Sequence, residues 1–377
     1  MADEEDDDDE GAAPASARGP RPTVLVVFNQ KGGIGKTTTS VNLAVALAAF
    51  GRSVVVIDLD SQSNATSSLG LVGPPPTGAY ELISGRASLK KARKPTPYPG
   101  LWVCGATAEL AGADIELAVA DQPQRQLAHA LERLPDGVDW VVVDCPPALG
   151  MLPVNALVAG DAVLLPVAPE PMARDGLHKA WHHILRIRSH LNPGLEVAGI
   201  LLTMAENEDV HARMAETIRT EFGERVLPVV VPRDSTVMRA SVRDLPVVAM
   251  APEAPASRAY LDLAQLLIDR VAAGALRPVA AVPADPYVED EPAAAPEDRP
   301  AFTRALAVAN LEEWGREAMA NSVPADEHGQ PPIPNWGSAL DERDHAFAAS
   351  PWWKVGVAVL LVALGAVLGF VAGMKWG

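Results

Sequence analysis

The chain has 377 residues and a formal net charge of −17 at pH 7. This length suffices for one large domain with appendages or for two domains. A strongly acidic surface repels nucleic acid, which excludes a protein that binds DNA over its whole surface and leaves only a local basic patch for such a contact. The acidic N-terminus is unlike a secretory leader. Cys104 and Cys145 lie far apart in apolar surroundings, which indicates buried, reduced thiols.

Residues 1–21 begin with an unbroken acidic run, Asp3–Glu10, followed by a stretch rich in Ala, Pro and Gly. Like charges at this density repel one another, and there is little apolar surface to bury, so we expect a disordered tail. Two roles stay open for it. It is either a solubilising tail or an arm that competes with DNA for a basic surface.

Between residues 22 and 273, short apolar runs alternate with stretches whose apolar residues recur at helical spacing. The runs predicted as buried strands are Val24–Phe28, Val54–Ile57, Trp140–Val143, Val163–Val167, Val197–Leu202 and Val226–Val231. The predicted helices are Thr39–Phe50, Arg125–Leu134, Met172–His190, Val210–Phe222 and Arg258–Ala273, and the predicted surface loops are Pro74–Pro76 and Lys94–Gly100. This alternation predicts a doubly wound α/β domain with a mainly parallel sheet, as in P-loop NTPases.

The stretch Asn29–Thr38 joins the first strand to the first helix and has the composition of a phosphate-binding loop. Its glycines let backbone N–H groups approach phosphate oxygens, and the helix N-terminus adds free donors. Lys36 is predicted to reach the β- and γ-phosphates, and the Thr37 hydroxyl to bind Mg²⁺. The predicted nucleotide contacts in the loop are Gly32, Gly33, Ile34, Gly35, Lys36, Thr37 and Thr38. A second lysine, Lys31, precedes the glycines, although a phosphate loop by itself does not need one.

Acidic residues follow two of the predicted strands. Asp58 and Asp60 come at the end of Val54–Ile57, and period-2 alternation points both side chains the same way. Asp144 follows Trp140–Val143. Because ligands bind at the carboxyl ends of parallel strands, Asp144 is predicted to hold Mg²⁺ through a water, and Asp58 and Asp60 are predicted at the same edge of the sheet. The alternative for Asp58 and Asp60 is capping of the helical stretch that follows them.

After about Gly274 the composition changes, and Pro, Ala and acidic residues dominate residues 274–350. Such a composition is typical of a flexible, partly extended linker. Within it, residues 302–318 have the spacing of a short helix, and residues 331–336 resemble a docking segment, for which a plain spacer is the alternative.

Residues 351–377 contain a long apolar stretch. Val355–Met374 is uninterrupted and matches the ~20 residues that a helix needs to cross a bilayer core. Trp and Lys flank it on both sides, as at membrane interfaces. We therefore expect a single-pass tail anchor that leaves the ATPase domain on the cytoplasmic face of the cell membrane. Gly365, Gly369 and Gly373 would let two such helices pack closely, and ordinary glycine tolerance is the alternative.

Several ordered motifs resemble the ParA family of partition ATPases, within the broader group with a deviant phosphate loop that includes MinD. The likeness extends from about Thr23 to Ala273. It is carried by Asn29–Thr39, Asp58–Thr66, Asp144–Pro147, Leu191–Pro193, Gly199–Met204 and Val231–Arg233. The resemblance implies a Mg²⁺-dependent ATPase that forms a homodimer when ATP is bound and is stimulated by a ParB-like or other partner.

The resemblance also implies roles for single residues. Lys31 looks like the signature lysine that crosses to the nucleotide of the partner subunit, and Asp60 like the residue that orients the attacking water. With Lys36 they form the expected catalytic set, and the resemblance places Asp58 near the metal. Pro232 and Arg233 are expected near the adenine or on the adjoining dimer face.

Two features depart from the family pattern. Ser61 and Ser63 stand where the family commonly has Pro and Gly, which is expected to change loop stiffness. Glu253 and Pro255 stand where basic residues are frequent. Contacts between basic residues and phosphates supply most of the non-specific affinity for DNA. This chain has fewer basic residues at these positions, so non-specific DNA binding is kept only as an open alternative.

The sequence thus predicts a membrane-tethered ATPase that partitions or positions DNA or another large cargo. The alternative is a membrane-anchored scaffold or regulatory switch that binds nucleotide, hydrolyses little of it and uses it to set its oligomeric state. The presence of Lys31, Lys36, Asp60 and Asp144 together favours hydrolysis.

Overall fold

The computed structural model describes residues 21–206 and 209–274. Three predicted segments lie outside these ranges: the acidic tail, the linker with its helix 302–318, and the membrane span 355–374. Within the described ranges, no helix is both long enough and apolar enough to cross a bilayer.

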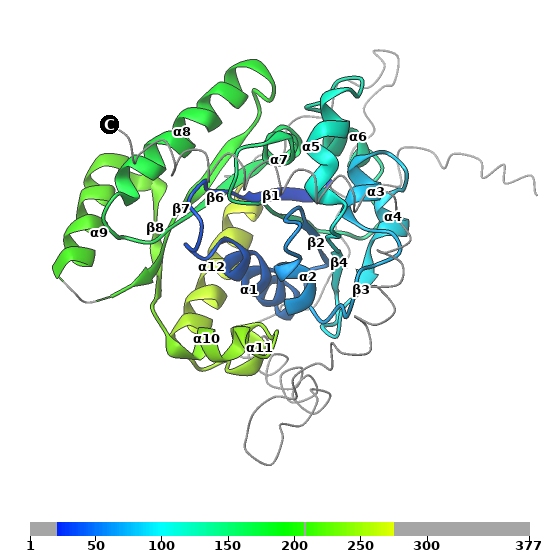
Figure 1. Cartoon of the computed structure of the whole chain (residues 1–377). Helices are drawn as coiled ribbons and strands as arrows, with labels where there is room; N and C mark the ends of the chain where they lie inside the picture. The colour runs from blue at the N-terminus through cyan, green and yellow to red at the C-terminus, as the bar shows by residue number, and fades with distance from the viewer. Residues whose placement is uncertain (1–20, 207–208, 275–377) are drawn as a thin grey trace, which may run out of the picture. The chain divides into compact units, whose positions relative to one another are not determined.

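An eight-stranded sheet runs through the described part of the chain in the order β3-β4-β2-β5-β1-β6-β7-β8 (Figure 1). The strands are β1 (Thr23–Val27), β2 (Val54–Asp58), β3 (Lys94–Pro95), β4 (Leu101–Cys104), β5 (Trp140–Asp144), β6 (Ala162–Val167), β7 (Glu196–Ala205) and β8 (Val226–Pro232). Neighbours are parallel throughout, except that β3 pairs antiparallel with β4. β5 lies between β1 and β2, so Asp144 is in register with both Val27 and Asp58 at the carboxyl edge of the sheet.

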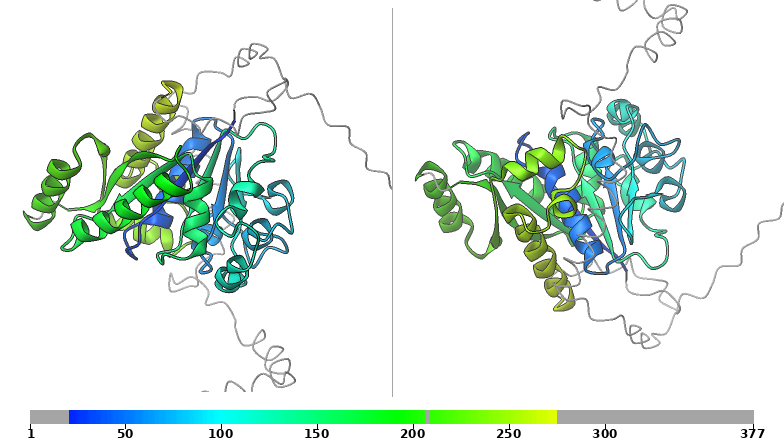
Figure 2. Two further views of the ribbon diagram at one scale, coloured as in Figure 1. Left: turned by 90° about the horizontal axis from the view of Figure 1, so that it is seen from above. Right: turned by 90° about the horizontal axis from the view of Figure 1, so that it is seen from below.

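Helices cover both faces of this sheet, as Figure 2 shows from above and below. They are α1 (Lys36–Ala49), α2 (Asn64–Ser68), α3 (Ala79–Ile83), α4 (Leu89–Ala92), α5 (Leu110–Ala118), α6 (Gln126–Ala130), α7 (Met151–Ala159), α8 (Ala173–His190), α9 (Asp209–Phe222), the 3₁₀ turn η2 (Gly223–Arg225), α10 (Ser235–Ser241), α11 (Val247–Met250) and α12 (Pro255–Ala272). One core joins one face of the sheet to α1, α11 and α12, and the other joins the opposite face to helices from α3 to α9.

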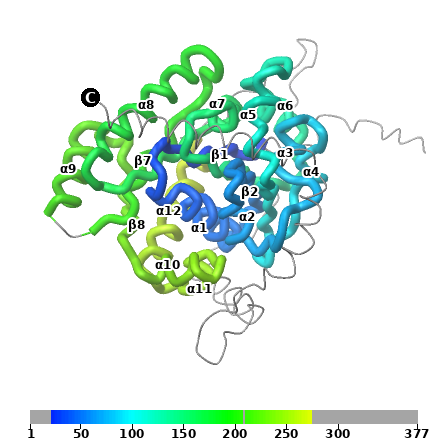
Figure 3. The backbone as a smooth tube through the Cα atoms, viewed as in Figure 1, coloured from blue at the N-terminus to red at the C-terminus, as the bar shows by residue number. Residues whose placement is uncertain are grey.

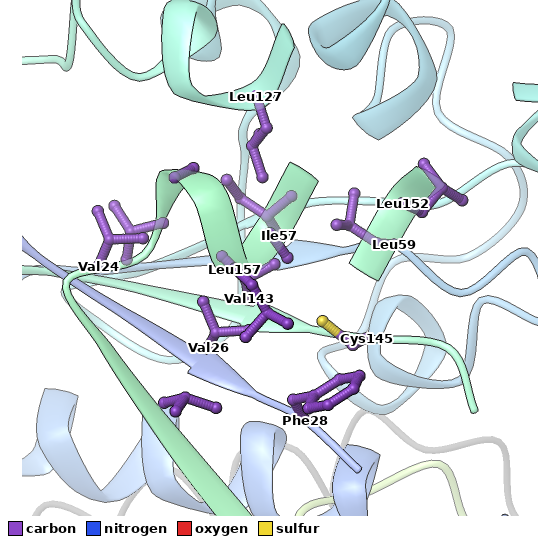
Figure 4. Packing of buried hydrophobic residues seen from close by; sticks show 14 of the residues in the cluster. Val24, Val26, Phe28, Ile57, Leu59, Leu127, Val143, Cys145, Leu152 and Leu157 are labelled. Carbon is purple, nitrogen blue, oxygen red and sulfur yellow. The ribbon is translucent and has the colours of Figure 1, made fainter. Parts of the chain in front are cut away.

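The burial of β1 on both faces of the sheet explains why the strands appear in the sequence as continuous apolar runs. Leu25 and Val27 pack into the core with α1, whereas Val24 and Val26 pack into the other one. A parallel strand covered on both faces needs apolar residues at every position. Figure 4 shows Val24, Val26 and Cys145 in the core that the sheet forms with helices from α3 to α9. Both cysteines are buried and unpaired, which confirms their predicted state.

Within residues 21–206 and 209–274, every predicted strand and helix is present, with shifted ends. α6 stops at Ala130, four residues before its predicted end at Leu134. α12 begins earlier than predicted, at Pro255, because proline is favoured in the first turn of a helix. The prediction of a surface loop at Lys94–Gly100 is wrong in part, since Lys94–Pro95 form β3. A stretch of two residues is too short to show the alternation of apolar and polar residues in a strand. Only its pairing with β4 makes β3 a strand.

Candidate nucleotide-binding site

The turn between β1 and α1 is an open loop built on glycine. Figure 3 traces it from the start of the chain into α1, which lies beside α2. Gly33 and Gly35 adopt left-handed conformations, with φ of 73° and 85°, that other residues rarely adopt. A Cβ at Gly32 or Gly33 would meet no atom within 4 Å, so the space in front of the loop is free. The Thr203 hydroxyl on β7 donates to the Ile34 carbonyl at 2.8 Å and fixes the loop to the sheet.

Lys36, the first residue of α1, is buried and folds back across the loop. Its Nζ donates to the carbonyl of Lys31 at 2.8 Å. Burial lowers the pKa of Lys36, and the negative charges of Asp144 and Asp60 oppose this shift. An ammonium group has three donors, so Lys36 can still bind an anion in front of the loop. Thr38, two residues further along α1, lines a cavity of about 80 Å³ between α1 and α10.

Asp144 presents a buried carboxylate oxygen that is not hydrogen-bonded. Its Oδ1 accepts from the Ser40 hydroxyl at 2.7 Å, whereas Oδ2 is buried without a hydrogen-bond partner among the described residues. Burial raises the pKa of Asp144, and the charge of Asp58 raises it further, while Ser40 and Thr37 oppose the shift. A divalent cation would restore the charged form.

The donor set around Asp144 fits magnesium that is bound together with a nucleotide. No group of three or more His, Cys, Asp or Glu in the described ranges could hold a metal by itself. Mg²⁺ is usually held by one or two protein oxygens, waters and substrate phosphates rather than by a cage of protein ligands. The free Oδ2 of Asp144 and the hydroxyl of Thr37 are such a pair.

Asp58 ends β2 and is fully buried, and protein donors already occupy its oxygens. Oδ2 accepts from the backbone N–H of Thr66 at 2.9 Å and from its hydroxyl at 2.7 Å. Oδ1 accepts from the N–H of Asp60 at 3.1 Å. Thr66 lies in the first turn of α2, so Asp58 caps that helix from a distance. Burial raises the pKa of Asp58, although these hydrogen bonds oppose the shift.

Asp60 follows β2 and is half-buried. Its Oδ1 accepts from the N–H of Gln62 at 3.0 Å. Its charge is close enough to act on Lys36 and on Asp144. The structure therefore brings Asp60, Lys36 and Asp144 to the same edge of the sheet.

The Lys31 side chain forms an ion pair with Glu170, which lies outside the loop. Its Nζ donates to Oε2 of Glu170 at 3.0 Å, and this hydrogen bond is the main reason why the pKa of Glu170 is lowered. Arg233 pairs with the other oxygen of Glu170 at 3.6 Å and with Glu206. Pro232 ends β8 and places Arg233 at the carboxyl edge of the sheet. Two predicted site residues, Lys31 and Arg233, thus meet through Glu170.

Sequence analysis missed Glu170, Ser40 and Thr203. Glu170 follows β6 much as Asp60 follows β2, so an acidic residue after a predicted strand was the signal. Ser40 lies four residues after Lys36 on the same helix face, which places it beside Asp144. Thr203 lies in the motif Gly199–Met204, but its contact with the loop had no local signal, because only the sheet brings the two together.

The parallel sheet, the glycine loop before α1 and the buried Lys36 beside Asp144 define a P-loop NTPase fold. A family model described as an AAA domain matches residues 22–197. The chromosome partitioning protein ParA of Caulobacter vibrioides is 40% identical over 251 residues, covering 66% of this chain and 94% of that protein. The sporulation initiation inhibitor protein Soj of Bacillus subtilis is 36% identical over 244 residues, covering 64% of this chain and 96% of that protein. The chain belongs to the ParA family of partition ATPases.

A solved structure supports the same assignment of the fold. Cobyrinic acid a,c-diamide synthase from Mycobacterium smegmatis, with bound ADP and magnesium, matches with a TM-score of 0.59 and 30% identity. The match covers 67% of this chain and 96% of that one.

Proposed function

We propose that this protein is an ATP-driven switch that dimerises on ATP binding, hydrolyses ATP, and thereby partitions or positions DNA or another large cargo from a membrane. One observation carries the proposal. The loop has its phosphate-binding lysine in Lys36, and it leaves a second lysine, Lys31, on the outside of the protomer. Family membership supports the ATPase, and the related M. smegmatis structure, which holds ADP and magnesium, supports the cofactors.

Bound ATP supplies the phosphoryl group, and bound Mg²⁺ neutralises charge on its oxygens. In the proposed site, Lys36 and the loop N–H groups hold the phosphates, and Thr37 and Asp144 hold the metal. Asp60 orients the attacking water. Asp58 lies beside Asp144 in the sheet, near the proposed metal, and we assign it to positioning Asp60 and α2, because its oxygens accept from Asp60 and Thr66.

Lys31 supports the dimer. In the single protomer its Nζ is held by Glu170 and by nothing in the loop. The ion pair is about one-third exposed on both sides, with side-chain exposures of 36% and 34%. Such pairs are worth about 0–1 kcal/mol, so a phosphate on a second protomer can compete for the lysine. Arg233 shares Glu170 and would retain it after Lys31 has moved.

The membrane and the partners are proposed from the sequence. Residues 355–374 would fix each protomer to the cytoplasmic face of the cell membrane, so the cycle would change the geometry of protomers that are already confined to one surface. A ParB-like or other activator would accelerate hydrolysis. A gel-shift with ATP across a salt series tests DNA binding, because phosphate contacts weaken steeply with salt. The absence of any shift at low salt would remove DNA from the proposal.

ATP turnover of the full chain in detergent tests the switch. We expect the wild type to turn over ATP with a rate per protomer that rises with protein concentration, because the active unit is a dimer. Asp60→Ala should lose turnover and still dimerise with ATP, whereas Lys31→Gln should lose both. Lys90→Gln, an exposed lysine on α4, is the matched control and should match the wild type. Equal turnover in the wild type and Asp60→Ala would favour the nucleotide-dependent scaffold instead.

A further inference from the structure

Helix α8 exposes a basic face on an otherwise acidic protein. The whole chain has a net charge of −17, whereas α8 carries four Lys or Arg residues and one acidic residue. Leu177, Ile184 and Ile187 face the core, which turns the charged side of the helix to solvent. We define the basic α8 face as Lys179, His182, Arg186 and His190, which recur at helical spacing on one side of the helix.

The two halves of α8 differ in how their charge is balanced. In the N-terminal half, Glu221 of α9 accepts from Arg174 at 2.8 Å and lies 2.7 Å from the ring of His178. Along the rest of the helix, none of the three Lys and Arg side chains, Lys179, Arg186 and Arg188, has an ion-pair partner within residues 21–206 and 209–274. Arg125 of the α6 start donates to the carbonyl of Leu191 at 3.0 Å and adds positive charge just beyond the helix.

The N-terminal segment enters the domain beside this end of α8. Arg21 lies 4.0 Å from Asp161, at the start of β6. The carbonyl of Asp161 accepts from the N–H of Glu196, where β7 begins. Asn192, two residues after α8, donates to the carbonyl of Gly160 at 2.8 Å. The first described residues and the end of α8 therefore share one edge of the sheet.

We propose that the acidic segment Asp3–Glu10 docks on the basic α8 face of its own protomer. The eight consecutive carboxylates complement the charge of the face. The connection from Glu10 to Arg21 spans up to about 35 Å when extended, and the 18-residue helix is about 27 Å long, so the segment reaches the whole face. A short tether keeps the segment at an effective concentration in the millimolar range, which a free polyanion or a second copy does not match.

Zero-length crosslinking of the full chain tests the contact. A carbodiimide joins carboxylates to lysines in ion-pair contact, and Lys179 is the one lysine of α8. The exposed Lys90 and Lys91 of α4 serve as references. We expect more product between Asp3–Glu10 and Lys179 than with either reference, because only Lys179 lies on the basic α8 face. The excess should disappear at 1 M salt, where the Debye length is about 3 Å.

Variants and isotope labelling sharpen this test. Arg186→Gln should reduce the Lys179 product, and Lys90→Gln should leave it unchanged. In a mixture of light and heavy protomers, the products should join peptides of the same isotope. Equal yields at Lys179 and at the α4 lysines would overturn the proposal, and products that mix isotopes would assign the face to the segment of a second copy.

Salt elution from heparin, a sequence-independent polyanion, gives a second readout. Replacing the acids of Asp3–Glu10 by Asn and Gln should raise the elution salt, because the basic α8 face becomes free. Adding Lys179→Gln and Arg186→Gln should cancel that increase, whereas adding Lys90→Gln and Lys91→Gln should cancel much less of it. Equal cancellation by the two pairs would mean that the segment acts only through net charge, which contradicts docking.

Discussion

The charged residues of the site are arranged for a ligand more than for the stability of the free protomer. Lys36 and Asp144 are buried. Burial lowers the pKa of Lys36 and raises the pKa of Asp144, and both shifts favour the neutral form of the side chain. Asp144 also keeps one oxygen without a partner. Buried groups of this kind destabilise the folded chain unless a ligand compensates them. Functional sites commonly trade stability for activity in this way.

Asp144→Asn should therefore stabilise the nucleotide-free protein above neutral pH. The folded pKa of Asp144 is raised, so the folded chain binds more protons than the unfolded chain between the two pKa values, and stability falls as pH rises through that window. Removing the charge should raise the free energy of unfolding by on the order of 1–3 kcal/mol at pH 8, and by little at pH 4. Urea unfolding at both pH values measures this.

The same variant should bind nucleotide less tightly when Mg²⁺ is present, by about 10–100-fold. Asp136→Asn changes an exposed carboxylate and should leave stability within about 0.5 kcal/mol at either pH. A less stable Asp144→Asn protein at pH 8 would contradict the argument from burial.

Ser63 adopts a left-handed backbone conformation, with φ of 57°, where the family commonly has glycine. Its hydroxyl donates to the carbonyl of Ala106 at 3.2 Å. Both Ser63→Gly and Ser63→Ala lose this hydrogen bond, but only glycine relieves the conformation. We expect Ser63→Gly to be about 1 kcal/mol more stable than Ser63→Ala in urea unfolding. Ser61 does not have a positive φ. We therefore expect the Ser61→Ala protein to be more stable than the Ser61→Gly protein in the same measurement.

At the scale of elements, β7 and α8 contain glycines with opposite roles. A Cβ at Gly199 of β7 would lie 2.2 Å from Leu227, in the contact between β7 and β8. A Cβ at Gly176 of α8 would meet no atom within 4 Å. The first glycine is required by packing, whereas the second only costs helix stability.

Gly199→Ala should lower the melting temperature, because overpacking costs about 1–3 kcal/mol. Gly176→Ala should raise it, since alanine is favoured over glycine in a helix by about 0.5–1 kcal/mol. Differential scanning calorimetry of both variants beside the wild type measures the two shifts. Shifts of the same sign would contradict this account of the two elements.

The elements differed in how well the sequence predicted them. Long buried strands such as β5 and amphipathic helices such as α8 carry enough residues to show a period. β3 has two residues and α4 has four, so neither is long enough to show a hydrophobic period in the sequence. Both depend on contacts with the rest of the domain. The glycine loop and the aspartates at the strand ends were predicted as one site. The loop indicates phosphate binding and the aspartates indicate a metal, and both are expected at the same edge of the sheet.

At the scale of the whole molecule, we predict that the region after Ser350 anchors the chain. A version that ends at Ser350 should leave the membrane fraction, because it lacks the ~20 apolar residues that a span needs. Cell fractionation with and without carbonate washing measures this, and Lys36→Gln in the full chain is the control for nucleotide state. If the shortened version fractionated with membranes as fully as the intact chain, the tail would not be the anchor.

The sequence alone determined the α/β class and the positions of Lys36, Thr37 and Asp144, because a strand, a glycine loop and a helix are local features with periods and spacings of their own. For Asp58 the sequence left two roles open, and the structure shows the capping contact, in which Asp58 accepts from Thr66 eight residues later. Tertiary structure alone decided what Lys31 does in the protomer, because its pairing with Glu170 spans 139 residues. A contact at that separation leaves no local pattern, so only the folded sheet brings the two residues together.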